Sequence, residues 1–265
     1  MLHKKTPMFF PRIFIINLEQ QHDRRRKIRK ILEELGLEDQ VHFLSAFTKN
    51  SELVEWYAYK CVPRETSGIG EKTGFLRGRP GKLEIAVFLS HLNAIKHIAD
   101  LPEDEPYGIV CEDDVTFRTD FQEKVKEILP LGYDMVHLSY LFHDPPSAAI
   151  HSSKFLFETP LALSGAQCYL VRRSHAQYLV DKMDHPIRLI QPREGIEVTS
   201  ELLLQRDSET TQVFIPDDSE PHCASIVYPP LAIERKQEGT RQVHPGHHWW
   251  FDKFRRAHSF VGENE

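Results

Sequence analysis

The sequence contains little that is typical of a secreted or membrane-spanning protein. It has only four cysteines in 265 residues, and none forms a CxxC pair, so neither a zinc knuckle nor a redox motif is indicated. Cys111 and Cys168 lie in apolar stretches, a pattern that fits a reducing compartment and leaves a disulfide open. No apolar run approaches the roughly 20 residues that span a bilayer, and no cleavage pattern of a signal peptide is present. We expect a soluble, cytoplasmic protein of enzyme size.

An excess of positive charge is also missing. The formal net charge is −6, which argues against a general nucleic-acid binder because such proteins present a basic face. Neither GxxxxGK[ST] nor GxGxxG occurs, and the glycine-rich stretch at 66–81 predicts either a basic lid over phosphates or an ordinary surface loop. Apolar residues make up 40% of the chain, enough for the core of one domain.

The most informative stretch is Tyr107–Phe117. Gly108–Cys111 reads as a buried strand, and it runs directly into Glu112, Asp113 and Asp114. Three carboxylates at the end of a buried strand repel one another and lose hydration unless a cation or a proton compensates. Oxygen ligands of this kind suit Mg²⁺ or Mn²⁺, which commonly bind substrate phosphates. The sequence predicts a metal site for a nucleotide diphosphate; the alternative is an acidic turn whose three side chains face water.

The chain begins with an alternation typical of α/β proteins. Ile13–Ile16 is a continuous apolar run, as in a strand buried on both faces. An amphipathic helix over 28–35 follows, and Val41–Phe47 reads as a second strand. Arg24 and Arg25 lie between the first strand and its helix. Ligands of such sheets bind beyond the carboxyl ends of the strands, so these arginines are expected either to meet an anion or to form a solvated helix start.

Lys82–Ala99 has the longest helical pattern. It is apolar around much of its circumference, which indicates a central, buried helix. Glu84, Ser90 and His91 on such a helix need polar partners. His91 by itself is more often a core histidine with satisfied hydrogen bonds than a catalyst.

Later elements continue the same architecture. Strands are predicted at 134–139, 155–157 (as an edge strand), 167–171, 213–215 and 226–228, and helices at 121–129 and 174–183. Thr199 or Ser200 would cap a further short helix, with Glu201 near its start, where the helix dipole favours a carboxylate.

The C-terminal tail mixes histidines, aromatics and arginines. Metal binding, an anionic membrane surface or another chain are alternatives for it, but HxxHH lacks the spacing of an HExxH zinc site. We expect a helix that packs Trp249, Trp250 and Phe254 against the domain.

Taken in order, these segments resemble glycosyltransferase family 25, which includes bacterial lipooligosaccharide galactosyltransferases and collagen-hydroxylysine galactosyltransferases. The resemblance covers roughly residues 12 to 232, and the segments that carry it are IFIINLEQQHDRRRKIRKILEELGL, GKLEIAVFLSHLNAIKHIA, YGIVCEDDVTF, DMVHLSY, SGAQCYLVRRSHAQYLV and YPPLA. It implies a GT-A-like single domain of the α/β class, with a Rossmann-like mixed central sheet flanked by helices. We place this domain at residues 1–235 and a C-terminal aromatic and basic tail that packs on it at 236–265.

The resemblance also implies roles for the acidic stretch. Glu112 and Asp114 match the position of the DxD-like metal-binding motif, with Asp114 as the main ligand of Mn²⁺ or Mg²⁺. Glu201 matches the second member of a later acidic pair and is the expected general base, with Asp113 as a second catalytic residue. The first member of that pair is Ser200 in this chain.

Two further segments are implied to contact the nucleotide. Asn17, Asp23 and Arg24 match the family's strand-to-helix segment, and Glu84, Ser90 and His91 match its buried helix. Leu83 stands where the family has glycine, which puts a close backbone approach there in doubt.

The implied function is metal-dependent transfer of a hexose, galactose or glucose, from a UDP-sugar to a hydroxyl of a glycan or of a glycosylated or hydroxylated protein, with inversion. Lipopolysaccharide biosynthesis is the expected context, without a nucleic-acid partner, and peripheral membrane contact and a homodimer stay open. Two other functions also stay open. One is a metal-dependent nucleotidyltransferase, and the other is a non-catalytic descendant that binds a glycan or a partner.

Overall fold

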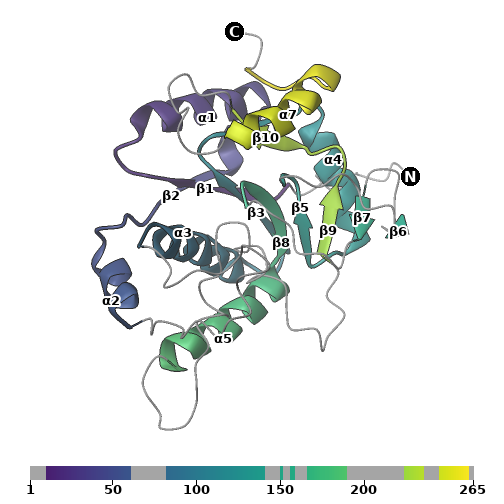
Figure 1. Cartoon of the computed structure of the whole chain (residues 1–265). Coiled ribbons are helices and arrows are strands. Elements are labelled where there is room, and N and C mark those ends of the chain that lie inside the picture. Colours follow the sequence, from purple (N-terminus) through teal and green to yellow (C-terminus); the bar gives the residue numbers. More distant parts are fainter. Residues whose placement is uncertain are drawn as a thin grey trace, which may run out of the picture.

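A mixed β-sheet of eight strands, in the order β2-β1-β3-β8-β5-β9-β7-β6, lies at the centre of the described part of the chain (Figure 1). The computed structural model describes residues 10–60, 82–140, 150–151, 156–158, 166–189, 224–235 and 245–262. The strands of this sheet are β1 (Arg12–Asn17), β2 (Val41–Ser45), β3 (Tyr107–Glu112), β5 (Met135–His137), β6 (Ile150–His151), β7 (Leu156–Glu158), β8 (Cys168–Arg172) and β9 (Ala224–Val227).

The strand directions bring the polar ends of several strands to one edge. β1 is parallel to β2 and β3, whereas β8 is antiparallel to both β3 and β5. The ends of β1 and β3 therefore lie beside the start of β8. Asn17 and the three acids predicted to form a site lie at this edge.

Helices cover both faces of the sheet. α1 (His22–Glu34) and α4 (Phe121–Ile128) pack on one face, and α3 (Lys82–Ala99), α5 (Arg173–Leu189) and α2 (Glu52–Lys60) lie on the other (Figure 1). Short 3₁₀ turns occupy Glu38–Gln40 and Leu129–Leu131. The expectation of a mixed central sheet flanked by helices is thus confirmed.

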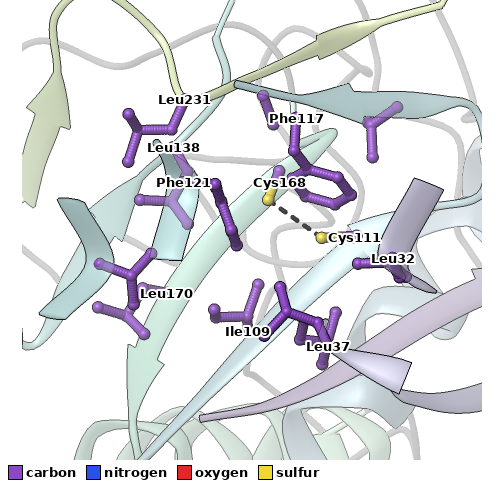
Figure 2. Close-up of a cluster of buried hydrophobic side chains, with 14 of the residues drawn as sticks. Leu32, Leu37, Ile109, Cys111, Phe117, Phe121, Leu138, Cys168, Leu170 and Leu231 are labelled. Carbon is purple, nitrogen blue, oxygen red and sulfur yellow. Dashed lines mark hydrogen bonds between the residues drawn. The ribbon is translucent and has the colours of Figure 1, made fainter. Parts of the chain in front are cut away.

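The core beneath the acidic turn is apolar and includes two cysteines. Cys111 on β3 pairs in register with Cys168 on β8, and Figure 2 shows their Sγ atoms facing each other among leucine, isoleucine and phenylalanine side chains. The two Sγ atoms are 3.0 Å apart and both residues are free thiols. The strand that carries the acids is thereby anchored in a tightly packed layer.

Helix α3 lies very close to β3. A Cβ atom added at Gly108 would be 2.6 Å from Cγ1 of Ile98, nearer than two carbon atoms can approach. The absence of a side chain at Gly108 is therefore what allows the helix to pack at this depth.

A small second sheet and a C-terminal helix complete the described part. β10 (Ala232–Glu234) pairs antiparallel with β4 (Val115–Phe117), and α7 (Pro245–Ala257) packs beside them. Trp250, Phe251 and Phe254 of α7 are buried. A domain boundary at residue 235 stays a prediction.

The structure corrects one expectation of strand order. The segment expected as an edge strand at 155–157 is β7, and it lies between β9 and β6. The two-residue strand β6 takes the edge position instead. The expected strand at 213–215 lies outside the described residues. A separate finding is that no helix of the described part is long and apolar enough to cross a membrane.

Candidate active site

The three consecutive acids are at the carboxyl end of β3, and they do not all face water. Glu112 is the last residue of β3, and its N–H donates to the carbonyl of Gln167 over 2.9 Å. Its side chain is partly exposed, whereas Asp113 is only 6% exposed. The alternative of a fully solvated acidic turn is therefore wrong.

Asp113 is held by residues that follow β1. Nδ2 of Asn17 donates to Oδ2 of Asp113 over 2.6 Å, and Nη1 of Arg24 donates to Oδ1 over 3.1 Å. Asn17 ends β1, and α1 begins only a few residues later, so both side chains reach the same edge. Both oxygens of Asp113 are thus engaged, an arrangement that suits positioning more than abstraction of a proton.

Asp114 lies in a more strained electrostatic environment. Nη1 of Arg24 also donates to Oδ2 of Asp114 over 3.3 Å, while Oδ1 of Asp114 is buried and has no hydrogen-bond partner. Burial raises the pKa of Asp114 to about 8, and the neighbouring charges of Glu112 and Glu234 add to this effect. The carboxyl group therefore retains its proton near neutral pH unless a cation stabilises the carboxylate.

Glu112 and His91 form the second part of the site. Nε2 of His91 is 3.4 Å from Oε1 of Glu112, and Nδ1 is 2.9 Å from the hydroxyl of Tyr169. Burial, together with the charge of Glu112, raises the pKa of Tyr169 well above its usual value, so the hydroxyl keeps its proton. When this hydroxyl donates to Nδ1, the ring proton lies on Nε2 and faces Glu112.

Ser90 connects the buried helix to the loop after β2. Its hydroxyl donates to the carbonyl of Ala86 over 2.7 Å and accepts a hydrogen bond from the N–H of Phe47 over 2.9 Å. Ser90 therefore holds the wall of the site and does not present a free hydroxyl to it.

A cavity of about 440 Å³ opens beside these groups. Its volume falls in the range of small-molecule sites, and it combines apolar walls with a few charged groups, as such sites do. The lining residues come from the end of β1, the loop after β2, the start of α3 and the acidic turn: Ile16, Leu18, Gln20, Arg24, Ala46, Phe47, Thr48, Lys49, Asn50, Leu83, Ala86, Val87, Ser90, His91, Glu112 and Asp113.

Some of the residues expected at the site do not join it. Asp23 is exposed and pairs with Arg26 on the surface of α1, 2.7 Å away. Glu84 lies in α3, but its side chain is not among those described. Ser200 and Glu201 lie outside the described residues. Leu83 is 68% exposed and lines the cavity.

The described donors fit one kind of metal site only. No group of three or more His, Cys, Asp or Glu side chains in the described part is arranged to hold a metal ion. The unpartnered oxygen of Asp114 and the partly exposed carboxylate of Glu112 fit a cation bound by one or two carboxylates, with phosphate and water as further ligands. That is the usual way in which Mg²⁺ binds phosphate substrates.

Two buried residues at this edge did not follow from the sequence. Tyr169 supports His91, and its only signal was a phenol in an otherwise apolar strand, since buried tyrosines usually have a partner. Arg235 donates from Nη2 to the carbonyl of Asp113 over 2.6 Å, a contact that no pattern in the sequence indicates.

Comparison with known proteins identifies relatives of this chain. Residues 10–191 match the family model described as glycosyltransferase family 25 (LPS biosynthesis protein). Procollagen galactosyltransferase 1-B of Xenopus laevis is 30% identical over 145 residues, which are 51% of this chain and 22% of that protein. A glycosyltransferase 25 family member of Drosophila pseudoobscura pseudoobscura is 26% identical over 141 residues, 52% of this chain and 21% of that protein.

The matches therefore span well under two thirds of the length of these relatives. Among solved structures, the crystal structure of A197 from STIV aligns with 89% of this chain and 100% of its own, at 11% identity and a TM-score of 0.37. We base nothing on a similarity at this level.

Proposed function

The chain belongs to glycosyltransferase family 25, and from this premise we propose that it transfers a hexose from a UDP-sugar to a hydroxyl group of a glycan or protein acceptor. Galactose is the first sugar to test because two of the relatives are named procollagen galactosyltransferases. Glucose is the second. We further propose a divalent metal, Mn²⁺ or Mg²⁺, inversion at the sugar carbon and a GT-A arrangement of the site.

One observation carries the proposal: acidic, amide and guanidinium groups from β1, α1 and β3 converge beside a cavity of nucleotide size. Arg24 and Asp113 line this cavity together with the apolar side chains of Phe47 and Val87. A nucleotide diphosphate likewise combines a flat, partly apolar base with a charged diphosphate. The apolar walls suit the base, and the charged end suits the diphosphate.

The side chains divide the work of binding in the following way. Asn17 orients Asp113, and Arg24 connects Asp113 with Asp114. Asp114 and Glu112 are the residues that would hold the cation, which supplies positive charge to the leaving diphosphate. Arg24 is partly exposed at the cavity, so its guanidinium charge can attract phosphate oxygens there. His91 fixes one oxygen of Glu112.

A general base is needed to activate the acceptor hydroxyl. We propose Glu201 for this role on the family resemblance; a positioned base contributes on the order of 10²–10⁴-fold to the rate. Glu201→Gln is expected to keep its affinity for the UDP-sugar and to lose most of its turnover. Retained turnover would remove Glu201 from the mechanism.

The direct test is incubation with UDP-galactose or UDP-glucose and Mn²⁺, followed by analysis of the nucleotide products. Release of UDP supports a glycosyltransferase. Release of the sugar 1-phosphate, with transfer of the UMP group, would instead support a nucleotidyltransferase, for which the described part offers no glycine-rich phosphate loop.

A binding protein without catalysis is the second candidate, and Leu83 is the observation that favours it. This side chain lines the cavity at the position where the family resemblance implies glycine. Isothermal titration of UDP, combined with the assay for UDP release, separates the two cases. Mn²⁺-dependent UDP binding without UDP release from any UDP-sugar would indicate a binding protein.

The context of the reaction is also proposed. We infer that the sugar transfer takes place in the cytoplasm on a lipopolysaccharide-type acceptor and that no nucleic acid is a partner. The side chains of Trp250, Phe251 and Phe254 in α7 are buried, so these three are not available for peripheral membrane contact. Vesicle sedimentation and light scattering test membrane contact and a homodimer.

A further inference from the structure

The acidic turn is held from behind by a residue near the C-terminus. β10 pairs with β4 so that Glu234 lies opposite Val115, which brings Arg235 next to Asp114. The backbone N–H of Arg235 donates to the carbonyl of Asp114 over 2.7 Å, and Nη2 of Arg235 donates to the carbonyl of Asp113 over 2.6 Å. One residue thus binds two successive carbonyl groups of the turn.

Arg235 is buried, with 9% of its surface exposed. A buried guanidinium group is costly unless it is compensated by hydrogen bonds and negative charge, and the acidic turn supplies both. The carbonyl of Asp113 would lose its guanidinium donor if this side chain were removed, and an unsatisfied buried acceptor destabilises the fold. The turn and Arg235 therefore stabilise each other.

Arg24 and Arg235 hold the same turn in different ways. Arg24 follows β1 and contacts the carboxylates of Asp113 and Asp114, whereas Arg235 contacts the backbone of the same two residues. The first arginine is partly exposed at the cavity. The second is buried away from solvent and suits a fixed, supporting role.

The segment that carries Arg235 is itself anchored. Arg255 of α7 donates to the carbonyl of Glu234, and the Thr116 hydroxyl donates to the carbonyl of Val261 over 2.5 Å. The buried side chains of Ile233, Phe251 and Phe254 belong to one cluster. β10 and α7 (yellow, Figure 1) therefore form one packed unit with β4. β4 lies within the residues that match the family model, whereas β10 and α7 lie beyond them.

We propose that Arg235 is a positioning residue for the binding of the metal and the diphosphate, and that the unit of β10 and α7 belongs to the site. Arg235 fixes the backbone of residues 113 and 114, so that the carboxylates of Asp113 and Asp114 point toward Arg24. This inference rests on the proposed function, because it assigns a supporting residue to the same site.

The test compares Arg235→Gln and Arg235→Lys with the wild-type protein. We expect Arg235→Gln to lower the affinity for UDP in the presence of Mn²⁺ by about tenfold, the lower end of what loss of a supporting contact costs a metal site. Arg235→Lys keeps the charge and one donor and should recover about half of that loss on a logarithmic scale. Isothermal titration measures both.

Hydrogen exchange gives a second readout that does not depend on a ligand. Amide exchange over residues 111–116 should speed up in Arg235→Gln and stay unchanged over β1. The matched control is Arg172→Gln, since Arg172 also donates from its side chain to a backbone carbonyl, that of Gly132, far from the acidic turn. This control should leave the UDP affinity and the exchange of the turn unchanged.

The outcomes separate the two proposals. If the wild-type protein does not bind UDP with Mn²⁺, the proposed function fails, while hydrogen exchange still shows whether Arg235 fixes the turn. If the wild-type protein binds and folded Arg235→Gln binds equally well, with unchanged exchange, the role of Arg235 is refuted. If Arg235→Gln does not fold, Arg235→Lys decides: wild-type affinity and exchange would then overturn the inference.

Discussion

Arginine and acidic residues lie at both edges of the sheet that β1 and β3 reach, but their numbers are balanced at only one of these edges. At one end, Arg12 makes a two-pronged pair with Glu105, with both N···O distances at 2.5 Å. At the other end, the side chain of Arg24 meets the carboxylates of both Asp113 and Asp114, with Glu112 close by. The first cluster has one cation for each anion, and the second has an excess of acid.

This difference distinguishes a structural ion pair from a site. Arg12 and Glu105 satisfy each other at the surface, where such a pair contributes about 0.2–1 kcal/mol. At the acidic end an oxygen of Asp114 stays buried without a hydrogen-bond partner, and burial and neighbouring charge raise the pKa of the group. A protein that keeps an uncompensated acid in this way has a use for added positive charge.

Among the variants considered, Asp114→Asn is expected to have the largest effect. This change removes a charge that the proposed cation needs, and we expect a loss of at least about 100-fold in Mn²⁺-dependent UDP affinity, beyond what second-shell changes cost. Thermal unfolding should occur at the same or a higher temperature, because the asparagine side chain needs no proton uptake to be buried, whereas the carboxyl group of Asp114 does. Isothermal titration and circular dichroism measure the two effects.

The matched control is Glu105→Gln at the opposite end. It also removes one carboxylate charge that is paired with arginine, yet it should leave UDP affinity unchanged. Equal losses in the two variants, or full affinity in Asp114→Asn, would contradict the assignment of Asp114.

His137 is a buried titratable group that lies in neither of the two clusters. His137 is fully buried, neither of its ring nitrogens has a hydrogen-bond partner among the described residues, and burial lowers its pKa to about 3. Its folded-state pKa is below the unfolded value, so stability is lost as the pH falls from about 6.5 toward 3. His137→Leu should remove that contribution, about 1.4 kcal/mol per pH unit in this range.

Urea unfolding at pH 7 and pH 5 measures the effect. The difference in unfolding free energy between these two pH values should be smaller in the variant by roughly 2 kcal/mol. An unchanged difference would mean that His137 does not titrate in this way. Tyr169 is its aromatic neighbour, with ring centroids 6.3 Å apart, and provides a control, since Tyr169→Phe removes no group that titrates in this range.

Arg24→Gln should have a smaller effect on binding than Asp114→Asn. It removes the cation that joins Asp113 and Asp114 and a donor at the cavity, and we expect about a tenfold loss in UDP affinity, the size of one charge-assisted hydrogen bond. Surface plasmon resonance at two ionic strengths measures the loss. A larger loss than in Asp114→Asn would reverse the roles proposed for the two residues.

The smallest effect is expected for Arg12→Gln. The pair with Glu105 lies partly in solvent, with the Arg12 side chain 36% exposed, so the unfolding free energy should fall by about 0.2–1 kcal/mol. High salt should reduce this difference, because salt screens exposed charges. UDP affinity should stay unchanged, and a loss as large as that in Arg24→Gln would erase the distinction between the two ends.

The sequence predicted the part of the site that depends on strand order. An apolar run followed by acids predicted β3 and its turn, and the short distance from β1 to α1 predicted that Arg24 reaches the same edge. Because parallel strands end at one edge, Asn17 and Asp113 can meet although they are 96 positions apart in the sequence. Periodicity and composition were sufficient for β3 and for Arg24, whereas Asn17 was expected at the site only from the family resemblance.

The missing parts depend on rotation about a helix and on short strands. Asp23 and Arg24 are adjacent, yet a helix turns about 100° per residue, so Arg24 enters the site while Asp23 remains in solvent. Arg235 reaches the turn because the three-residue strand β10 pairs with β4, and three residues carry no periodic signal. Tertiary packing decides both cases.

The close packing at Gly108 has a consequence for the far end of the strand. His91 precedes Ile98 by seven residues on α3, about 10 Å along the helix axis, and Ile98 touches β3 where a side chain is absent. A methyl group at this glycine would press against the side chain of Ile98, and a displacement of α3 that relieves this contact would also move His91 relative to Glu112. Loss of activity by mutation is therefore expected at a position that no substrate can reach.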